Sequence, residues 1–288
     1  MEEKKNSNYF LLICLIIIVA MGVGIYHLYE KIEEVSTSQS QINVETKLEE
    51  ISIEEDLVKK LYGYILQSDD FDHAFAWQNS LEPTSFYRKE KTTYLNLSDI
   101  EKTLVILKNY TNNEIKTINK SKLTNIIDTT HIRDDVKVYE NINEKATEIF
   151  NQESDKWNDY VGCAGVVEYR NGNYYLSRFD GGGKGTSEVG YAKMQKAEKE
   201  EDYIYIYDKF VYIDSTNYDI GYGDSKVHIY TTSDKANELG TENEGIWSSN
   251  TIIDEIYKKY EEQLKIFKHT FKKTENGNYY WVSSEMYE

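Results

Sequence analysis

The chain has few of the residues that cross-link or interrupt a fold. Its 288 residues include one proline, Pro83, and two cysteines, Cys14 and Cys163. Cys14 lies within a long apolar run that we interpret below as a membrane helix, so the two cysteines cannot pair within one molecule. A disulfide scaffold is therefore excluded. A lone Cys163 is most often a small buried apolar side chain.

Basic residues are scarce relative to acidic ones. Lys and Arg total 33 against 50 Asp and Glu, which gives a formal net charge of −17. So acidic a chain repels nucleic acid and anionic headgroups, and we predict no nucleic-acid partner. The charge is typical of a solvated acidic surface, and it also suits a cationic partner.

Recognisable catalytic and metal-binding motifs are missing. The histidines form no H-E-x-x-H motif and no close Cys/His group. They are His27, His73, His131, His228 and His269. No G-x-S-x-G motif occurs, and nothing local supports Cys163 as a thiol nucleophile with a distant histidine as its base. We therefore predict no catalytic residue, no cofactor and no metal site.

Two polar loops are weaker candidates for binding sites. Gly181 to Gly185 could cradle an anion on backbone N–H groups, but Gly185 follows Lys184 where a phosphate-binding loop needs Ser or Thr. We interpret this stretch as a linker. Asp214, Asp219 and Asp224 could offer oxygen ligands to Ca²⁺, but their spacing fits no EF-hand register. A plain acidic loop is the favoured interpretation.

The feature that organises the chain is an apolar run from Tyr9 to Leu28. No Asp, Glu, Lys or Arg occurs between Asn6 and Tyr29. As a helix this run is roughly 30 Å long, which matches the hydrocarbon core of a bilayer. A helix also satisfies its own backbone hydrogen bonds in lipid. We predict a single transmembrane helix at 9–28 after a tail at 1–8, so that the membrane is one partner.

The charges beside this run predict its orientation. Lys4 and Lys5 precede it and Lys31 alone follows closely, so the positive-inside rule predicts a cytoplasmic N-terminus and an extracellular C-terminal domain. A cleavable signal peptide is the alternative, with Ala20-Met21-Gly22 or Gly22-Val23-Gly24 as its cleavage site. Lipid attachment at Cys14 is excluded, because Cys14 lies inside the apolar run.

Residues 29–51 read as a stalk. Leu28, Val35 and Ile42 are spaced by seven residues, which hints at a continuing helix or a dimerising coil. The polar run from Ser36 to Gln41 argues against a sustained coiled coil.

Residues 52–159 read as a mainly helical segment. Ser52 to Glu55 and Ser98 to Glu101 match the capping box that begins a helix. Ile53, Leu57, Leu61 and Ile65 then predict one apolar stripe. Further helical pieces are expected around Phe71, Phe75 and Trp77, at Ser121 to Asp128 and at Asn143 to Asn151, with a strand at Val136 to Tyr139.

Residues 160–288 read as an antiparallel α+β domain. Asn-Gly pairs at 171–172 and 276–277 lie between strand-like runs, which is a strong hairpin signal. The predicted strands are Val161 to Tyr169, Tyr174 to Phe179, Tyr203 to Ile213, Lys226 to Thr232, Ile266 to Thr274 and Tyr279 to Ser284. The predicted helices are Thr186 to Glu201 and Thr251 to Leu264. Phe271, Tyr279 and Trp281 should be buried, and Gly277 should have a positive φ.

The overall class is therefore α+β, because helices run first and a hairpin-rich sheet follows. The Lys-rich stretch Lys193 to Asp202, the aromatic strand, the last helix and the closing hairpin N-G-N-Y-Y-W-V-S-S-E resemble a group of uncharacterised membrane-anchored proteins of low-GC Gram-positive bacteria. The resemblance covers roughly Ser52 to Glu285 and implies an extracytoplasmic location. The closing helix and hairpin are also similar to the NTF2-like fold, whose members mostly bind ligands rather than catalyse.

These observations favour a non-enzymatic protein- or ligand-binding module of the bacterial cell envelope. A cell-envelope hydrolase with an unrecognised active site is the alternative. Abundant aromatic residues either line a sheet face that stacks on sugars or peptides, or fill the core, and we favour the core. They are Tyr174, Tyr175, Tyr203, Tyr205, Tyr207, Tyr279, Tyr280 and Trp281.

Overall fold

The computed structural model describes residues 48–66, 83–123, 132–154, 156–161, 165–179, 188–214, 226–243 and 250–287. The predicted membrane helix Tyr9–Leu28 lies outside these residues, and none of the helices within them is long and apolar enough to cross a bilayer. The α-helices are α2 (Asp56–Ile65), α4 (Asp99–Lys108), α5 (Ile142–Phe150) and α6 (Asn250–Tyr260). Short 3-10 turns are η1 (Pro83–Phe86), η2 (Tyr94–Asn96) and η3 (Lys120–Lys122).

The described strands form two antiparallel sheets, which confirms the predicted α+β class with antiparallel pairing. The larger sheet has the order β1-β8-β9-β12-β13-β2, with β10 pairing with β9 and β11 pairing with β10. Its strands are β1 (Glu49–Ile51), β2 (Thr92–Thr93), β8 (Glu188–Glu200), β9 (Tyr203–Asp214), β10 (Lys226–Tyr230), β11 (Glu238–Asn243), β12 (Lys265–Lys273) and β13 (Tyr279–Met286). The smaller sheet has the order β3-β4-β7-β6-β5. Its strands are β3 (Lys116–Asn119), β4 (Ile132–Tyr139), β5 (Tyr160–Val161), β6 (Gly165–Arg170) and β7 (Asn173–Phe179).

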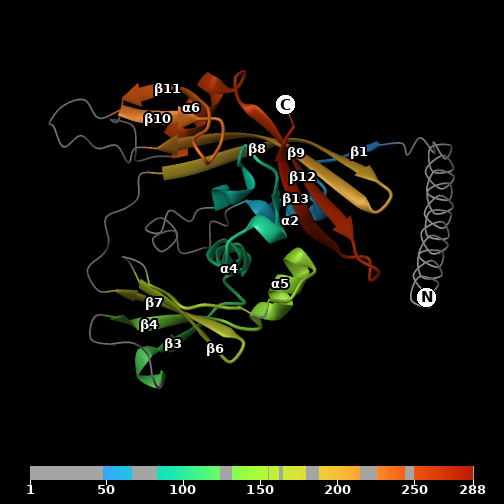
Figure 1. The fold of residues 1–288 in the computed structure, drawn as a ribbon. Helices are drawn as coiled ribbons and strands as arrows, with labels where there is room; N and C mark the ends of the chain where they lie inside the picture. The colour runs from blue at the N-terminus through green and yellow to red at the C-terminus, as the bar shows by residue number, and fades with distance from the viewer. Residues whose placement is uncertain are drawn as a thin grey trace, which may run out of the picture. The chain divides into compact units, whose positions relative to one another are not determined.

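The main core lies between the two sheets. Helices α2, α4 and α5 occupy that layer, and α6 lies on the other face of the larger sheet (Figure 1). Ile65, Leu107 and Phe150 of the three helices share one buried cluster with Tyr174 and Phe271 of the two sheets. Because the sheets and the helices bury a common core, they stabilise one another.

The closing hairpin and the last helix form as predicted. Phe271, Tyr279 and Trp281 are 0%, 7% and 1% exposed, and Gly277 has a φ of +87°. Ile256 and Tyr260 of α6 form a second buried cluster with apolar side chains of β9 and β10. The larger sheet is therefore covered by α6 over part of its outer face.

Helix starts follow the predicted capping boxes in one case only. Ser98 and Glu101 make the full reciprocal capping box at the start of α4. The expected box at Ser52 is wrong, because α2 begins at Asp56 and the Ser52 hydroxyl accepts from the backbone of Glu54.

The late start of α2 also moves its buried face. Leu61 and Ile65 are buried as expected, but Leu57 is 39% exposed and Val58 is fully buried instead. The apolar stripe therefore runs through Val58, not Leu57.

The predicted helix at Thr186 to Glu201 is wrong, because its residues from Glu188 to Glu200 form β8. The charged residues suit a helix, but Ala192, Met194 and Ala197 pack against the core on one face of the strand. Pairing with β9 runs along the whole of β8. This long-range pairing outweighs the local helical preference.

Residues 52–159 contain the predicted helical pieces α2, α4 and α5, but they also contribute strands to both sheets. The predicted strand near Val136 is longer, since β4 begins at Ile132. Of the helix expected at Ser121 to Asp128, only the turn η3 lies within the described residues. The piece around Phe71 to Trp77 lies outside them.

Candidate functional site

A chain of buried polar side chains crosses the core face of the larger sheet. Nδ1 of His269 lies 2.7 Å from Oγ of Ser284, and Nε2 of His269 lies 3.1 Å from Oδ1 of Asp208. Asp208 and His269 are fully buried, and Ser284 is 1% exposed. This serine–histidine–aspartate connectivity is the most chemically suggestive arrangement among the described residues.

Neighbouring strands bring these three residues together. Ser284 of β13 lies directly opposite His269 of β12 in the strand register. Asp208 lies on β9, the other neighbour of β12, where it is opposite Phe267. Because side chains alternate across a strand, Phe267 and His269 share one face, and Asp208 reaches His269 diagonally.

Two tyrosines from outside the sheet complete the environment of Asp208. The hydroxyls of Tyr62 and Tyr87 donate to Oδ2 of Asp208 at 2.7 and 2.6 Å. Burial, reinforced by the carboxylate of Asp208, raises the pKa of both tyrosines well above the ordinary 10.0. Both hydroxyls therefore stay protonated and act as donors. The ring of Tyr87 stacks on Phe210 with centroids 4.0 Å apart, which fixes its position.

Trp281 and His269 occupy both sides of the Ser284 hydroxyl. Nε1 of Trp281 is a donor only, and it lies 3.0 Å from Oγ of Ser284. His269 joins the two ends of the network, with Nδ1 facing the Ser284 hydroxyl and Nε2 facing the Asp208 carboxylate, which accepts from Nε2–H. Every polar side-chain atom of Ser284 and His269 is thereby satisfied within the core.

This closed arrangement does not fit a nucleophilic site. A reactive serine needs an accessible hydroxyl and a position beside it for the reacting carbonyl. Ser284 is almost fully buried, and its oxygen already accepts from Trp281. The network instead fastens α2 and the segment after η1 to the sheet through Tyr62 and Tyr87.

The opposite face of β9 carries a row of tyrosines. Tyr203 and Tyr205 are half-buried, with parallel rings whose centroids are 6.2 Å apart, and Tyr207 is buried beneath Lys196 and the ring of Tyr287. The aromatic residues named from the sequence are thus divided between two environments. Tyr174, Tyr279 and Trp281 belong to the core, as favoured, whereas Tyr203 and Tyr205 point outward.

Charged side chains border this tyrosine row on both neighbouring strands. Lys268 of β12 places its ammonium 3.9 Å from the ring centroid of Tyr205, and Lys272 lies over Tyr203 at 5.7 Å. On β8, Glu200 accepts from the hydroxyl of Tyr205 at 3.0 Å. Burial, together with this bond to Glu200, raises the pKa of Tyr205 to about 12. We call Tyr203, Tyr205, Lys268 and Lys272 the tyrosine–lysine face.

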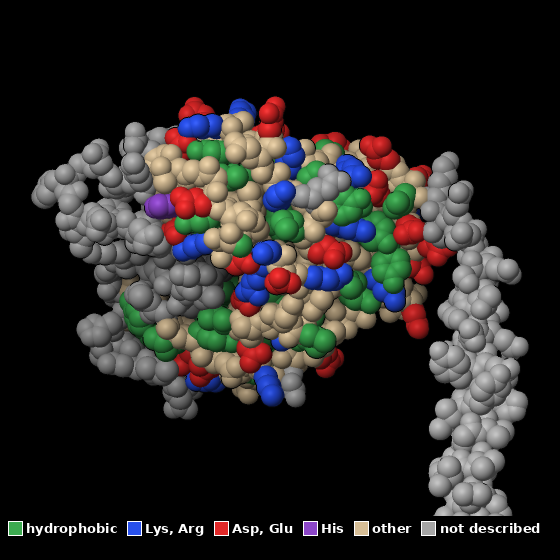
Figure 2. Space-filling model, turned by 45° about the horizontal axis from the view of Figure 1, so that its top comes forward, with side chains coloured by type: hydrophobic (Ala, Val, Ile, Leu, Met, Phe, Trp, Pro, Cys, Tyr) green, Lys and Arg blue, Asp and Glu red, His purple; other side chains and the backbone are tan. Residues whose placement is uncertain are grey.

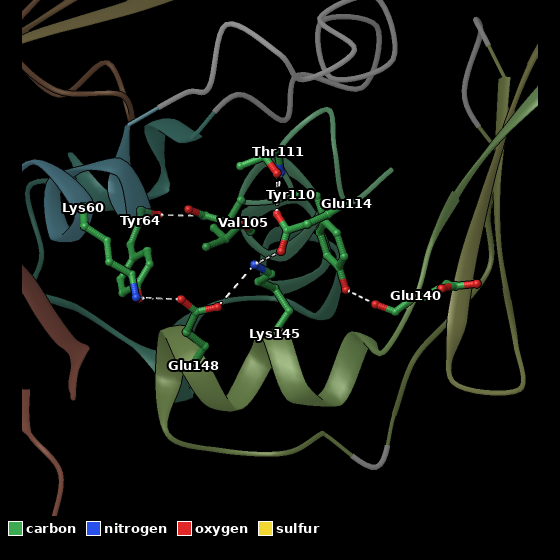
Figure 3. A network of polar contacts seen from close by, with 10 residues as sticks. Lys60, Tyr64, Val105, Tyr110, Thr111, Glu114, Glu140, Lys145 and Glu148 are labelled. Atoms are coloured by element: carbon green, nitrogen blue, oxygen red, sulfur yellow. Dashed lines mark hydrogen bonds and ion pairs between the residues drawn. The ribbon is translucent and has the colours of Figure 1, made fainter. Parts of the chain in front are cut away.

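A third polar network joins helices near the smaller sheet (Figure 3). Glu148 of α5 pairs with Lys60 of α2 at 3.0 Å and with Lys145 at 3.2 Å, and Tyr64 donates to it at 3.0 Å. Lys145 also pairs with Glu114 at 2.9 Å. These partly exposed ion pairs orient α2 and α5, and each contributes little to stability.

Most candidates named from the sequence lie outside the described residues. These are Cys163, Gly181 to Gly185, Asp219, Asp224, His27, His73 and His131. Among the described ones, Asp214 is buried and pairs with Lys235 at 2.6 Å, and His228 lies 2.7 Å from Glu238. No group of three or more metal-ligating side chains occurs in the described part of the chain.

The sequence reasoning missed Asp208, Ser284, Tyr62 and Tyr87. A signal for Asp208 was present, because it interrupts the inward apolar positions Ile204, Ile206 and Phe210 of strand β9. His269 similarly interrupts the inward pair Phe267 and Phe271.

Comparisons with protein-family models, curated proteins and solved structures found no match.

Proposed function

We propose that this chain is a single-pass membrane-anchored module of the bacterial cell envelope, which presents its α+β domain outside the membrane and binds another protein or a small ligand without catalysis. The observation that carries the non-enzymatic part is the closed network at Ser284. Its hydroxyl is buried and bonded to Trp281 and His269, which leaves it unexposed to a substrate. The outward-facing tyrosines offer contact area of the kind that binding surfaces use.

The proposal that the chain is membrane-anchored and extracytoplasmic is based on the sequence. The uncharged run Tyr9 to Leu28 has the length of a membrane span, and Lys4 and Lys5 favour a cytoplasmic tail. The envelope assignment follows from the resemblance to membrane-anchored proteins of low-GC Gram-positive bacteria.

Fractionation and protease protection test the topology. After a carbonate wash of membranes, the full-length chain should remain in the pellet, and protease added to intact cells should remove the C-terminal domain. A mature protein that begins near Val23 or Ile25 on N-terminal sequencing would mean that the segment is cleaved. Protection of the C-terminal domain in intact cells would mean that the orientation is reversed.

A second candidate function, hydrolysis in the cell envelope, is favoured by one observation. Asp208, His269 and Ser284 have the connectivity of an acid–base–nucleophile set, although the ring nitrogens are exchanged relative to the usual arrangement, in which the acid faces Nδ1. Turnover of small aryl esters by the full-length protein, lost on Ser284→Ala and His269→Gln, would support this function. We expect no turnover that depends on Ser284.

A further inference from the structure

Strand β12 concentrates positive charge within a strongly acidic chain. It reads K-I-F-K-H-T-F-K-K, with no Asp or Glu. Among the described residues, none of its lysines forms an ion pair, although Lys268 also interacts electrostatically with Glu198 of β8. Figure 2 shows Lys and Arg side chains lying among Asp and Glu side chains on the face drawn. The lysines of β12 are Lys265, Lys268, Lys272 and Lys273.

Two of these lysines belong to the tyrosine–lysine face. Lys268 lies opposite Tyr207 and Lys272 lies opposite Tyr203 in the register with β9, so both point away from the core. Four residues of strand separate them, which is about 13 Å. The rings of Tyr205 and Tyr203 contact the two ammonium groups by cation–π interaction, which leaves their charge available to a further anion.

The strands on the two sides of β9 carry opposite charges, with lysines on β12 and glutamates on β8. Glu198 and Glu200 of β8 lie opposite Tyr205 and Tyr203, on the side away from β12. Glu200 bonds to Tyr205, and Glu198 pairs with Lys196 at 3.0 Å. The positive strip is therefore about one strand wide.

We propose that the tyrosine–lysine face binds an extended acidic polypeptide segment, whose carboxylates pair with Lys268 and Lys272 while its neutral side chains pack on Tyr203 and Tyr205. A uniform polyanion fits less well, because it would meet the acids of β8 beside the strip and the net charge of −17 around it. A polypeptide can place acids over β12 only, and tyrosine is enriched at protein interfaces. This proposal rests on the proposed binding function and names its partner class.

The probe is an extended peptide with Glu at every fourth position and Thr elsewhere, labelled with fluorescein, so that one face alternates Glu and Thr at the spacing of Lys268 and Lys272. Its fluorescence anisotropy is measured with the full-length protein in neutral detergent micelles at physiological salt. The wild type should bind it, and Lys268→Glu/Lys272→Glu should weaken binding about tenfold, since exposed ion pairs contribute a few-fold each and reversal adds repulsion. Lys122→Glu/Lys156→Glu is the matched control, because it makes the same charge change at exposed lysines elsewhere and should leave binding unchanged.

Absence of binding to the wild type, or equal weakening in both double variants, would overturn the proposal. Polyphosphate that displaces the peptide at equal charge concentration would also overturn it, because the face would then recognise anions in general. Lys268→Gln/Lys272→Gln supplies the test if the reversed variant does not fold. The two proposals fail separately. If the protein stays in the membrane pellet after the carbonate wash but does not bind the peptide, the binding site proposed here is wrong and the proposed function still stands.

Discussion

The hydroxyl of Tyr62 donates a 2.7 Å hydrogen bond to the buried carboxylate of Asp208, which lies 146 residues later in the chain. This bond joins the first described helix, α2, to the central strand β9 of the larger sheet. Because the carboxylate is fully buried, its charge is stabilised by Tyr62, Tyr87 and His269 and not by water.

Removing the Tyr62 hydroxyl should therefore destabilise the fold. Tyr62→Phe keeps the ring but withdraws one donor from a buried charge, so we expect a loss of about 2 kcal/mol in the free energy of unfolding. Tyr64→Phe is the control, because its hydroxyl bonds to the partly exposed Glu148 and should contribute less than about 1 kcal/mol. Urea unfolding measures both. Equal losses would contradict the importance of the Asp208 network.

The same tyrosines predict a loss of stability at alkaline pH. Burial raises the pKa of Tyr62 and Tyr87 above the ordinary 10.0, so the unfolded chain releases these protons at lower pH than the folded chain does. Their contribution is complete below pH 10 and declines as the pH rises above it. In urea unfolding between pH 8 and about 11, the wild type should lose more stability than Tyr62→Phe/Tyr87→Phe does. Parallel pH profiles would contradict the assignment.

The two predicted capping boxes now give a direct comparison. Ser98→Ala removes the cap of α4 and should lower the unfolding free energy by about 1 kcal/mol. Ser52→Ala should lower the unfolding free energy by only a few tenths of a kcal/mol, because Ser52 precedes α2 without capping it. Thermal unfolding of both variants checks this. A larger loss at Ser52 would show that α2 begins earlier.

Local signals account for the elements that the sequence predicted. The turn at Asn171-Gly172 has positive φ at both residues, and the capping box at Ser98 forms as its pattern requires. The failure at β8 has a physical cause. Its lysines and glutamates favour a helix locally, but the buried positions Ala192, Met194 and Ala197 and the pairing with β9 are tertiary effects.

The candidate site was less predictable than the fold. Asp208 and His269 are 61 residues apart, so no local spacing could connect them. Their shared signal was a polar residue at an inward position of an apolar strand. Reading it requires the strand register, which depends on pairing between β9 and β12.

Lys108 predicts a second pH effect with the opposite sign. Its Nζ is buried and donates to the carbonyl of Ile65 at 2.9 Å, and burial lowers the pKa of Lys108 well below 10.5. The unfolded chain therefore holds a proton that the folded chain releases, so the contribution of Lys108 to stability grows as the pH rises toward 10.5 and is lost as the pH falls.

Lys108→Met should show this effect by difference. Relative to the wild type, the variant should become less stable as the pH rises from about 7 to about 9.5, because it lacks the titrating group. Urea unfolding at the two pH values measures the change. Lys137→Met is the control, because the structure gives no ion pair for Lys137. The difference in unfolding free energy between this variant and the wild type should be the same at both pH values. A constant difference for Lys108→Met would contradict the account of this lysine.

Accessibility of Ser284 tests most directly the central claim that the buried Asp208–His269–Ser284 set is structural and that the domain binds without catalysis. The measurement is intact-protein and peptide mass spectrometry of the folded full-length chain after treatment with a fluorophosphonate, which modifies activated serines. We expect no adduct at Ser284, because its hydroxyl is buried and already accepts from Trp281. A stoichiometric adduct at Ser284 that is lost in His269→Gln would contradict the claim and establish a hydrolase site.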